Sequence, residues 1–399
     1  MTGALTTLLG FALLSGAQQK PEPPDPKAFE GIDPKKVDEA IESGVAFLRR
    51  LKEQKGDANT DELVAWTFLH AGVPADDPLL KTVLDRILKA PLERTYNVSL
   101  QAMVLEKLDP EAHLRRIYEC AQFLADNQCR NGQWSYGAPI APVTFTPPAS
   151  PKAKGTRAQR RIPVTRRAGG TTGKAGDNNV DSGDFSNSQY AALGIRACHD
   201  AGIVFPKAMI QEAREAWVKG QLASAGRKPG GVATPGGGAA PRGWAYRMGR
   251  GGGEGGADGA WGSMTVGGVG AVVLYDHILG TDWKRDPVVL SGMSWLAAHF
   301  KVDDNPEFVN ASVRWHHYYL YGLERAGSLF GTEKIGGRYW YREGVDHLLA
   351  QQERGGSWRD QGVDGSWGAS MRDTCFAILF LRRATRPVDV ASVDRFNPK

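Results

Sequence analysis

Apolar residues recur at intervals of three and four positions through most of the chain. This spacing indicates amphipathic α-helices, because positions i, i+3, i+4 and i+7 share one helix face. No long alternation of apolar and polar residues, which would indicate β-strands, competes with it. The pattern predicts twelve helices, at residues 33–52, 60–71, 76–89, 95–107, 110–128, 187–201, 206–222, 263–279, 284–300, 313–326, 340–353 and 371–384.

The predicted helices alternate in character. The first member of each successive pair carries a polar stripe, as in Val37 to Lys52 and Glu212 to Lys219. The second member is apolar or rich in small residues nearly all round, as in Gly267 to Ala271. A helix without a polar face belongs in an interior. We therefore expect an all-α (α/α)6 toroid of six hairpins, with the second members as an inner ring and the first members as an outer ring.

One phrase occurs twice: a helix that ends in Gln, followed within a few residues by Gly-x-Trp. Glutamine can close a helix end, glycine permits the turn, and tryptophan packs under the next repeat. The two copies are Gln128, Gly132 and Trp134, and Gln352, Gly356 and Trp358. The phrase resembles the Gln-Trp repeat of squalene cyclases and the related Gly-rich repeat of protein prenyltransferases. That resemblance, to the terpenoid cyclase and prenyltransferase α/α toroid superfamily, covers roughly residues 33–385. It implies that these six residues are structural braces.

The chemistry of the cyclases does not follow from the resemblance. Squalene-type cyclases protonate an alkene with an Asp-x-Asp-Asp cluster, whose neighbouring carboxylates keep the acid protonated. Here Lys301-Val-Asp303-Asp304 lacks the first Asp, and Asp181-Ser-Gly-Asp184 has the wrong spacing. We therefore expect a non-catalytic binding or scaffold module with a central cavity for an apolar or isoprenoid ligand, and no cofactor. An enzyme of the terpenoid or prenyl class, with a mechanism that these motifs do not reveal, is the alternative.

Polar residues recur near the starts of the predicted inner helices, where the mouth of a toroid lies. Helix N-termini there also offer unpaired N–H groups. Alignment of the inner helices on their C-terminal ends places six candidates at this mouth: Glu62, Tyr190, Trp315, His317, Asp373 and Cys375. We expect the polar members, on consecutive inner helices, to share one face of the cavity.

Three of these candidates resemble the zinc ligands of protein prenyltransferases, an Asp-x-Cys on one inner helix and a His on the adjacent one. Asp373 and Cys375 correspond to the first element and His317 to the second, although their order along the chain is reversed. Thiolate, imidazole and carboxylate suit Zn²⁺. The alternative is that Cys375 is a small core residue, Asp373 a helix cap and His317 a hydrogen-bonded inner residue.

A second enzyme class uses the same architecture. Many exported carbohydrate-active enzymes are (α/α)6 toroids with aromatic platforms and a pair of carboxylates. Glu62 and Asp373 are candidates for such a pair. Further acids lie in expected rim loops beside tryptophans: Asp258, Asp360 and Asp364, with Trp261, Trp358 and Trp367. The alternative is that these are ordinary solvated loop acids.

Two long loops interrupt the helical pattern. Residues 139–186 contain no acid before Asp177. The eight positive charges in the stretch 152–174 exceed the net charge of the whole chain, which is +5. This composition predicts a disordered, solvated insertion, and the charge suits contact with an anionic surface. Residues 226–262 are rich in glycine and enclose Trp244 and Trp261, which we expect to pack. No feature points to specific nucleic-acid binding.

The two ends of the chain lie outside the predicted toroid. Residues 1–17 combine an apolar stretch with a small-x-small cleavage pattern, which predicts a signal peptide and export to the periplasm or the outside of the cell. Residues 18–32 form a Pro-rich linker and 386–399 a tail. In an oxidising compartment Cys120 and Cys198 could form a disulfide; two buried free thiols are the alternative.

Overall fold

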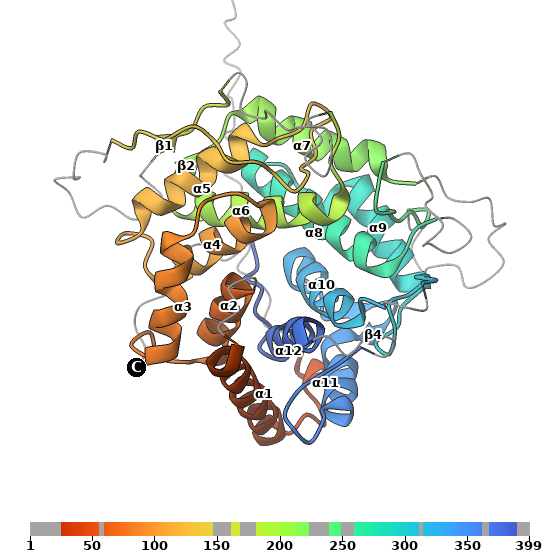
Figure 1. The fold of residues 1–399 in the computed structure, drawn as a ribbon. Helices are drawn as coiled ribbons and strands as arrows, with labels where there is room; N and C mark the ends of the chain where they lie inside the picture. Colours follow the sequence, from red (N-terminus) through yellow and green to blue (C-terminus); the bar gives the residue numbers. More distant parts are fainter. Residues whose placement is uncertain are drawn as a thin grey trace, which may run out of the picture.

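The computed structural model of the protein describes residues 25–55, 60–146, 161–167, 181–222, 239–248, 259–310, 314–360 and 367–388. Within these ranges the chain forms twelve α-helices arranged as two rings (Figure 1). The outer helices are α1 (Pro34–Lys55), α3 (Pro78–Lys89), α5 (Leu114–Asp126), α7 (Lys207–Gly220), α9 (Pro287–Ala298) and α11 (Trp340–Gln351). The inner helices are α2 (Asp61–Ala71), α4 (Thr95–Leu108), α6 (Phe185–Asp200), α8 (Gly262–Leu279), α10 (His316–Phe330) and α12 (Trp367–Leu381).

The inner ring is closed. Each inner helix packs against the next, from α2 through α4, α6, α8 and α10 to α12, and α12 packs back against α2. The outer helices lie against the inner ones, and α1 also contacts α11. The predicted (α/α)6 toroid is therefore confirmed, together with the assignment of every helix to its ring.

Burial follows the polarity pattern that predicted the two rings. In the inner helix α2, all eight residues from Asp61 to Phe68 are buried. In the outer helix α3, only Leu80, Val83, Leu84 and Ile87 are buried, which is one stripe of the helix. Apolar surface on all sides therefore places a helix in the inner ring, and an apolar stripe places it in the outer ring.

Helix ends differ from the predictions by a few residues where local chemistry sets them. Helix α5 begins at Leu114 rather than 110, because the Asp109 carboxylate accepts from the N–H groups of Glu111 and Ala112 and holds a separate turn. Helix α10 begins at His316 because Trp315 adopts a left-handed conformation with φ of 53°. Helix α12 already begins at Trp367.

The described residues include only four short strands. Strand β1 (Ile162–Pro163) pairs in parallel with β2 (Ile203–Val204), and β3 (Lys334–Ile335) pairs antiparallel with β4 (Arg338–Tyr339). Strand β1 belongs to the expected disordered insertion. That expectation is wrong for residues 161–167, because Arg166 pairs with Glu212 and Arg167 with the buried Asp126. Residues 147–160 and 168–180 lie outside the described part of the chain.

The expected linker begins to pack earlier than the sequence indicates. From residue 25 the chain lies against the toroid: the Tyr339 hydroxyl donates to Asp25, and the Phe29 ring packs against Tyr341. At the other end, Val388 is buried. The expected signal peptide, residues 1–17, lies outside the described residues.

The second copy of the repeated phrase joins the last outer helix to the first. The Trp358 side chain is fully buried, and its indole N–H donates to the Leu348 carbonyl of α11 at 2.8 Å. The Gln352 amide donates to the Ala40 carbonyl of α1 at 2.8 Å. The first copy joins α5 to α7 in the same way, through Trp134 to Leu124 and Gln128 to Met209. Both copies are braces between successive hairpins.

A third copy of this brace is present that the sequence did not reveal. The Gln221 amide donates to the Val288 carbonyl of α9, and the Trp244 indole donates to the Trp217 carbonyl of α7. Trp244 is fully buried, as is nearly all of Trp261, so the expected packing of both residues is confirmed. In this copy the glutamine and the Gly243-Trp244 pair are separated by a long insertion, which hides the repeat in the sequence.

Two further properties bear on the sequence predictions. Among the described residues, none of the helices combines the length and the apolar character that a bilayer crossing requires. Cys120 and Cys198 lie on the neighbouring helices α5 and α6 as buried free thiols, and their sulfurs donate to Gln101 and to the Ile117 carbonyl.

Candidate functional site

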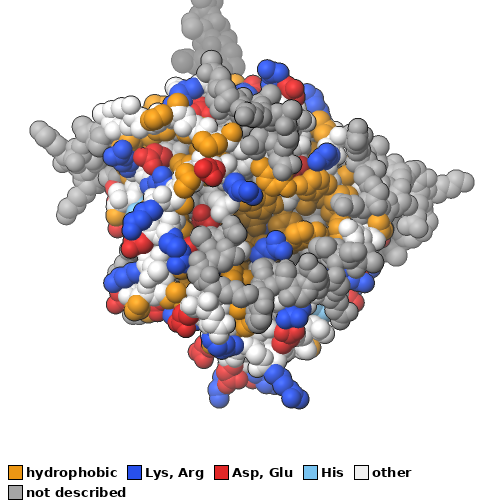
Figure 2. Space-filling view, viewed as in Figure 1, with side chains coloured by type: hydrophobic (Ala, Val, Ile, Leu, Met, Phe, Trp, Pro, Cys, Tyr) orange, Lys and Arg blue, Asp and Glu red, His pale blue; other side chains and the backbone are white. Residues whose placement is uncertain are grey.

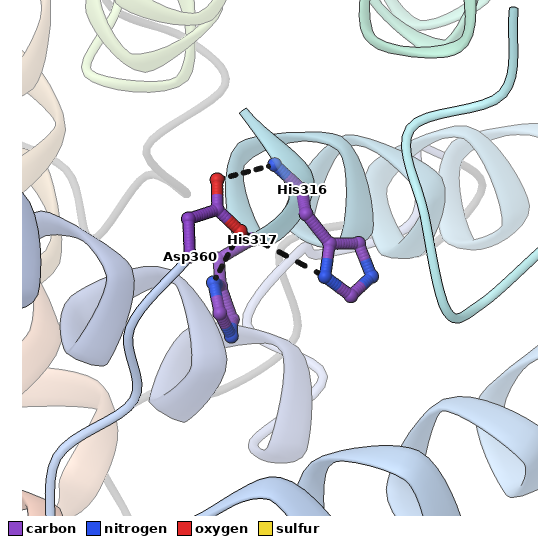
Figure 3. Close-up of side chains that lie close together, drawn as sticks. All are labelled: His316, His317 and Asp360. Carbon is purple, nitrogen blue, oxygen red and sulfur yellow. Dashed lines mark hydrogen bonds and ion pairs between the residues drawn. The ribbon is translucent and has the colours of Figure 1, made fainter. Parts of the chain in front are cut away.

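A compact cluster of His316, His317 and Asp360 lies at the start of the inner helix α10 (Figure 3). The two histidines occupy the first turn of the helix, and Asp360 comes from the connection between α11 and α12. The left-handed backbone of Trp315 ends the preceding segment and starts this turn. A non-glycine residue in that conformation stores strain, and such residues concentrate at functional sites.

The cluster is buried and closely spaced. One ligand atom from each of the three side chains lies within 4.8 Å of the other two. The Asp360 Oδ1 atom is 3.3 Å from the Nδ1 of His317 and 3.8 Å from the Nδ1 of His316. The other oxygen, Oδ2, accepts the His316 backbone N–H at 2.8 Å. The carboxylate is therefore held against the helix N-terminus with one oxygen turned toward both rings, as Figure 3 shows.

The environment sets opposite protonation tendencies within this cluster. Burial, with help from the neighbouring His317, lowers the pKa of His316 to about 4, so that ring is neutral at neutral pH. Burial alone would raise the pKa of Asp360, but the His317 ring and the His316 N–H outweigh it and the pKa is lowered. A neutral imidazole and an ionised carboxylate therefore face each other in a buried position.

Asp373, one of the residues predicted at the mouth, supports this cluster from α12. Its Oδ2 accepts the backbone N–H of Asp360 at 3.0 Å, and its Oδ1 lies 3.9 Å from the Nδ1 of His317. Burial raises the pKa of Asp373 to about 6. The predicted proximity of His317 and Asp373 is thus present.

The other predicted mouth residues lie elsewhere. The Cys375 sulfur is not part of the cluster; its hydrogen-bond partner is Thr67 of α2, and burial raises the pKa of the thiol to about 12. The zinc set of His317, Asp373 and Cys375 therefore does not converge on a common point. Glu62 accepts from the Asn97 amide at 2.8 Å and forms a second polar pair. Trp315 is 40% exposed, beside the guanidinium of Arg372.

Tyr190 lies at the centre of the ring, in a group of aromatic side chains. Its ring packs 4.3 Å from Tyr96 of α4 and is stacked 6.4 Å from Tyr318 of α10. Phe376 of α12 packs 5.6 Å from the Tyr318 ring. The Tyr190 side chain is only 1% exposed. These rings, from α4, α6, α10 and α12, meet at the centre of the inner ring.

A line of polar groups runs from the mouth to this centre. Tyr96 and Ser186, both only half-buried, share a short hydroxyl contact. The Ser186 hydroxyl is 3.1 Å from that of Tyr318, which also contacts the Gln189 amide. The line ends at Arg325, whose Nη2 donates to the Gln189 side-chain carbonyl at 3.2 Å.

Arg325 is the most unusual group in the interior. It is 4% exposed, and its guanidinium lies 4.2 Å from the ring centroid of Tyr321 and 5.7 Å from that of Tyr190. Its Nη1 atom has no hydrogen-bond partner. Of the carboxylates in the described part of the chain, none forms an ion pair with Arg325 within 4.0 Å, although the charge of its sequence neighbour Glu324 acts on it at longer range. Glu324 instead accepts from Ser328 and Thr385.

The two carboxylates proposed as a pair for carbohydrate chemistry, Glu62 and Asp373, each bind a different partner. Glu62 is engaged with Asn97, and Asp373 with the Asp360 backbone. Asp360 is a buried partner of histidines rather than a rim acid. Asp258 and Asp364 lie outside the described residues, as does the side chain of Trp367.

Comparisons with known proteins add only weak likenesses. No family model matches the chain, and no curated protein matches it. Among solved structures, a possible member of the GH105 family from Salmonella enterica serovar Paratyphi A has 10% sequence identity and a TM-score of 0.44, over 87% of this chain and 82% of that chain. The type II terpene cyclase MstE from Scytonema has 12% identity and a TM-score of 0.32, over 88% of this chain and 99% of that chain. The α/α toroid architecture rests on the helix packing of the chain itself.

Sequence reasoning missed His316, Asp360 as its partner, and Arg325. His316 adjoins a predicted candidate, so the His-His pair was a signal for it. The sequence predicts Asp360 only as a rim acid, because the path of a loop cannot be inferred from helix registers. Arg325 lies in the C-terminal half of α10, away from the mouth positions. Nothing in the sequence around a single helical arginine indicates that it is buried.

Proposed function

We propose that this protein is a non-catalytic binding module whose ring of helices receives a largely apolar ligand with an anionic group at its centre. The observation that carries this proposal is the state of Arg325. Its charge is buried at the middle of the toroid, with no carboxylate of the described residues in direct contact with it and with one nitrogen unpaired. An arginine side chain stays protonated, so its burial cannot be relieved by loss of a proton.

The energetics of Arg325 favour a ligand. Removal of a charge from water costs several kcal/mol even after relaxation. The tyrosine faces offset about 1–2 kcal/mol each, and the hydrogen bonds to the side chains of Gln189 and Tyr190 offset only part of the remainder. A carboxylate or phosphate would accept two parallel hydrogen bonds from the guanidinium and neutralise its charge. A binding site therefore explains a group that is costly as a structural element.

The surroundings of Arg325 favour a ligand with an apolar body. The rings of Tyr190 and Tyr321 lie beside its guanidinium, and Phe376 stacks on the Tyr321 ring. On the face of the toroid in Figure 2, hydrophobic side chains gather in a hollow near the middle, over α8 and α10. Because Tyr96 and Tyr318 both pack against Tyr190 on the polar line that leads inward from the mouth, we expect the ligand to displace them.

The test uses a matched pair of isoprenoid probes, farnesyl phosphate and uncharged farnesol, titrated into the protein by calorimetry. We expect farnesyl phosphate to bind at least about tenfold more tightly, which is about 1.4 kcal/mol. The Arg325→Met variant, similar in length but uncharged, should lose this preference. Equal affinity of the native protein for both probes, or an undiminished preference in Arg325→Met, would contradict the proposal.

A stability measurement separates a binding arginine from a structural one. Substitution of an unpaired buried charge by an apolar residue of similar size is neutral or stabilising, so Arg325→Met should have a Tm equal to or above that of the native protein. Arg214→Met is the matched control, because Arg214 pairs with the buried Asp276. Its loss leaves a buried carboxylate without a charged partner and should cost about 3 kcal/mol. A comparable loss in Arg325→Met would show a structural role.

A further inference from the structure

We infer that His316, His317 and Asp360 form a binding site for a divalent transition-metal ion, with zinc as the best match. Two imidazoles and one carboxylate are a ligand set that zinc commonly uses, with a fourth position left open. The three side chains come from two separate segments, the first turn of α10 and the connection that follows α11. Their convergence is therefore a property of the fold and not of one stretch of sequence.

The spacing of the ligand atoms fits a tetrahedral ion. For metal–ligand bonds of about 2.0–2.1 Å, two ligand atoms of a tetrahedral site lie about 3.3–3.4 Å apart. The Asp360 Oδ1 atom is 3.3 Å from the Nδ1 of His317 and 3.8 Å from the Nδ1 of His316. All three ligand atoms lie within 4.8 Å of one another, so bonding to one ion requires them to draw together by side-chain rotation.

His316 has the hydrogen bond that orients a metal ligand. Its Nε2 is 2.8 Å from the Val302 carbonyl, and because a carbonyl only accepts, Nε2 carries the proton. In the neutral form of this ring the lone pair is therefore on Nδ1, which faces the Asp360 carboxylate. Two acceptors that face each other in a buried site repel, and a cation between them removes the repulsion. A histidine whose second nitrogen donates to a backbone carbonyl is the usual arrangement in metal sites.

His317 supplies an independent observation. Its side chain is 4% exposed, and its Nδ1 atom has no hydrogen-bond partner, although the Asp360 oxygen is only 3.3 Å away. A buried polar atom without a partner destabilises the folded state. The atom points toward the same carboxylate oxygen that the His316 ring faces (Figure 3). A metal ion at that point would satisfy His317, His316 and Asp360 together.

Asp373 is a positioning residue for this site. Its Oδ2 accepts the Asp360 backbone N–H at 3.0 Å and so fixes the loop that carries the Asp360 ligand. An amide oxygen can accept the same hydrogen bond, whereas alanine cannot. Loss of such an outer contact typically reduces metal affinity about 10–100-fold. Asp373→Ala should therefore weaken zinc binding by that factor, and Asp373→Asn should restore most of it.

The test measures zinc and cobalt binding to the full chain after treatment with a chelator and desalting. We expect one equivalent of zinc, a Tm that rises by several degrees with zinc, and the visible bands of four-coordinate Co²⁺. Because the ligands are nitrogen and oxygen, the near-ultraviolet charge-transfer band of a cobalt–thiolate bond should be absent. His317→Ala and the nearly isosteric Asp360→Asn should each abolish the stoichiometric binding.

Two control variants keep the test specific. Cys375→Ser should bind zinc as the native protein does, since the Cys375 sulfur lies outside the cluster. His113→Gln removes a histidine at the start of α5, far along the chain from the site, and should also bind normally. Failure of the native protein to bind zinc or cobalt would overturn the inference, as would equal zinc content in Asp360→Asn. A cobalt–thiolate band that disappears in Cys375→Ser would assign the metal to a different ligand set.

Discussion

At the scale of single residues, the sequence located polar groups but not their partners. It placed Glu62, His317 and Asp373 near the starts of inner helices, and all three are there. It grouped them on one face, whereas the structure pairs Glu62 with Asn97 and His317 with Asp360 and Asp373. Helix registers fix the height of a residue in the ring. They do not fix which neighbour its side chain meets, and they do not describe connecting loops at all.

Glu62 carries a prediction about pH. Burial raises the pKa of its carboxyl to about 7, against 4.5 for an ordinary glutamate. The folded state thus binds a proton more tightly than the unfolded state, so this contribution to stability is complete below about pH 4.5. It is lost as the pH rises to 7, by about 3 kcal/mol in total. Glu62→Gln, which stays neutral, should not lose it.

The measurement is the free energy of unfolding of both proteins between pH 4.5 and 8. The stability of Glu62→Gln relative to the native protein should increase with pH up to about 7 and then stay constant. Glu39→Gln, on the exposed side of α1, is the matched control and should run parallel to the native protein. A constant difference between Glu62→Gln and the native protein across this range would contradict the raised pKa.

At the scale of elements, the helices and their rings could be predicted, while one of the three braces could not. Polarity around each helix is a local property, and it decides whether the helix is inner or outer. The brace built on Gln221 and Trp244 has the same hydrogen bonds as the other two, but its parts are separated by the Gly-rich insertion. A rule based on sequence spacing cannot detect this brace, because Gln221 and Trp244 are far apart in the sequence and only the fold brings them together.

The three braces should contribute similarly to stability. Trp134, Trp244 and Trp358 are all fully buried. Each substitution to alanine should lower the free energy of unfolding by about 3–5 kcal/mol, as for other large aromatic truncations. Trp315→Ala, at an exposed position, should cost about 1 kcal/mol or less. Denaturant unfolding of the four variants measures this, and a Trp244→Ala value near that of Trp315→Ala would show that the third brace is not equivalent.

At the scale of the whole molecule, the closed ring should behave differently from an open array of helical hairpins. In an open array each repeat contacts only its neighbours, so the ends can unfold while the middle remains folded. Here α12 packs against α2, and α1 contacts α11, so none of the described helical hairpins is a free terminal repeat. The brace that makes this closure is the one at Gln352 and Trp358, which reaches α1 through the Ala40 carbonyl.

Gly356 tests this closure because it lies where the last brace meets α1. Its φ is +88°, and a Cβ atom there would lie 2.2 Å from the Ser43 carbonyl oxygen, so Gly356→Ala must strain or separate the two ends of the ring. The expected cost is about 2–4 kcal/mol, from the left-handed backbone and the steric overlap. Gly355→Ala, with nothing within 4 Å of its Cβ, is the adjacent control. Because every inner helix is held by two neighbours, hydrogen exchange in Gly356→Ala should accelerate throughout the inner ring, in α6 and α8 as well as in α1 and α12. Faster exchange confined to α1, α11 and α12 would show instead that the ring opens at its seam and unfolds from that end.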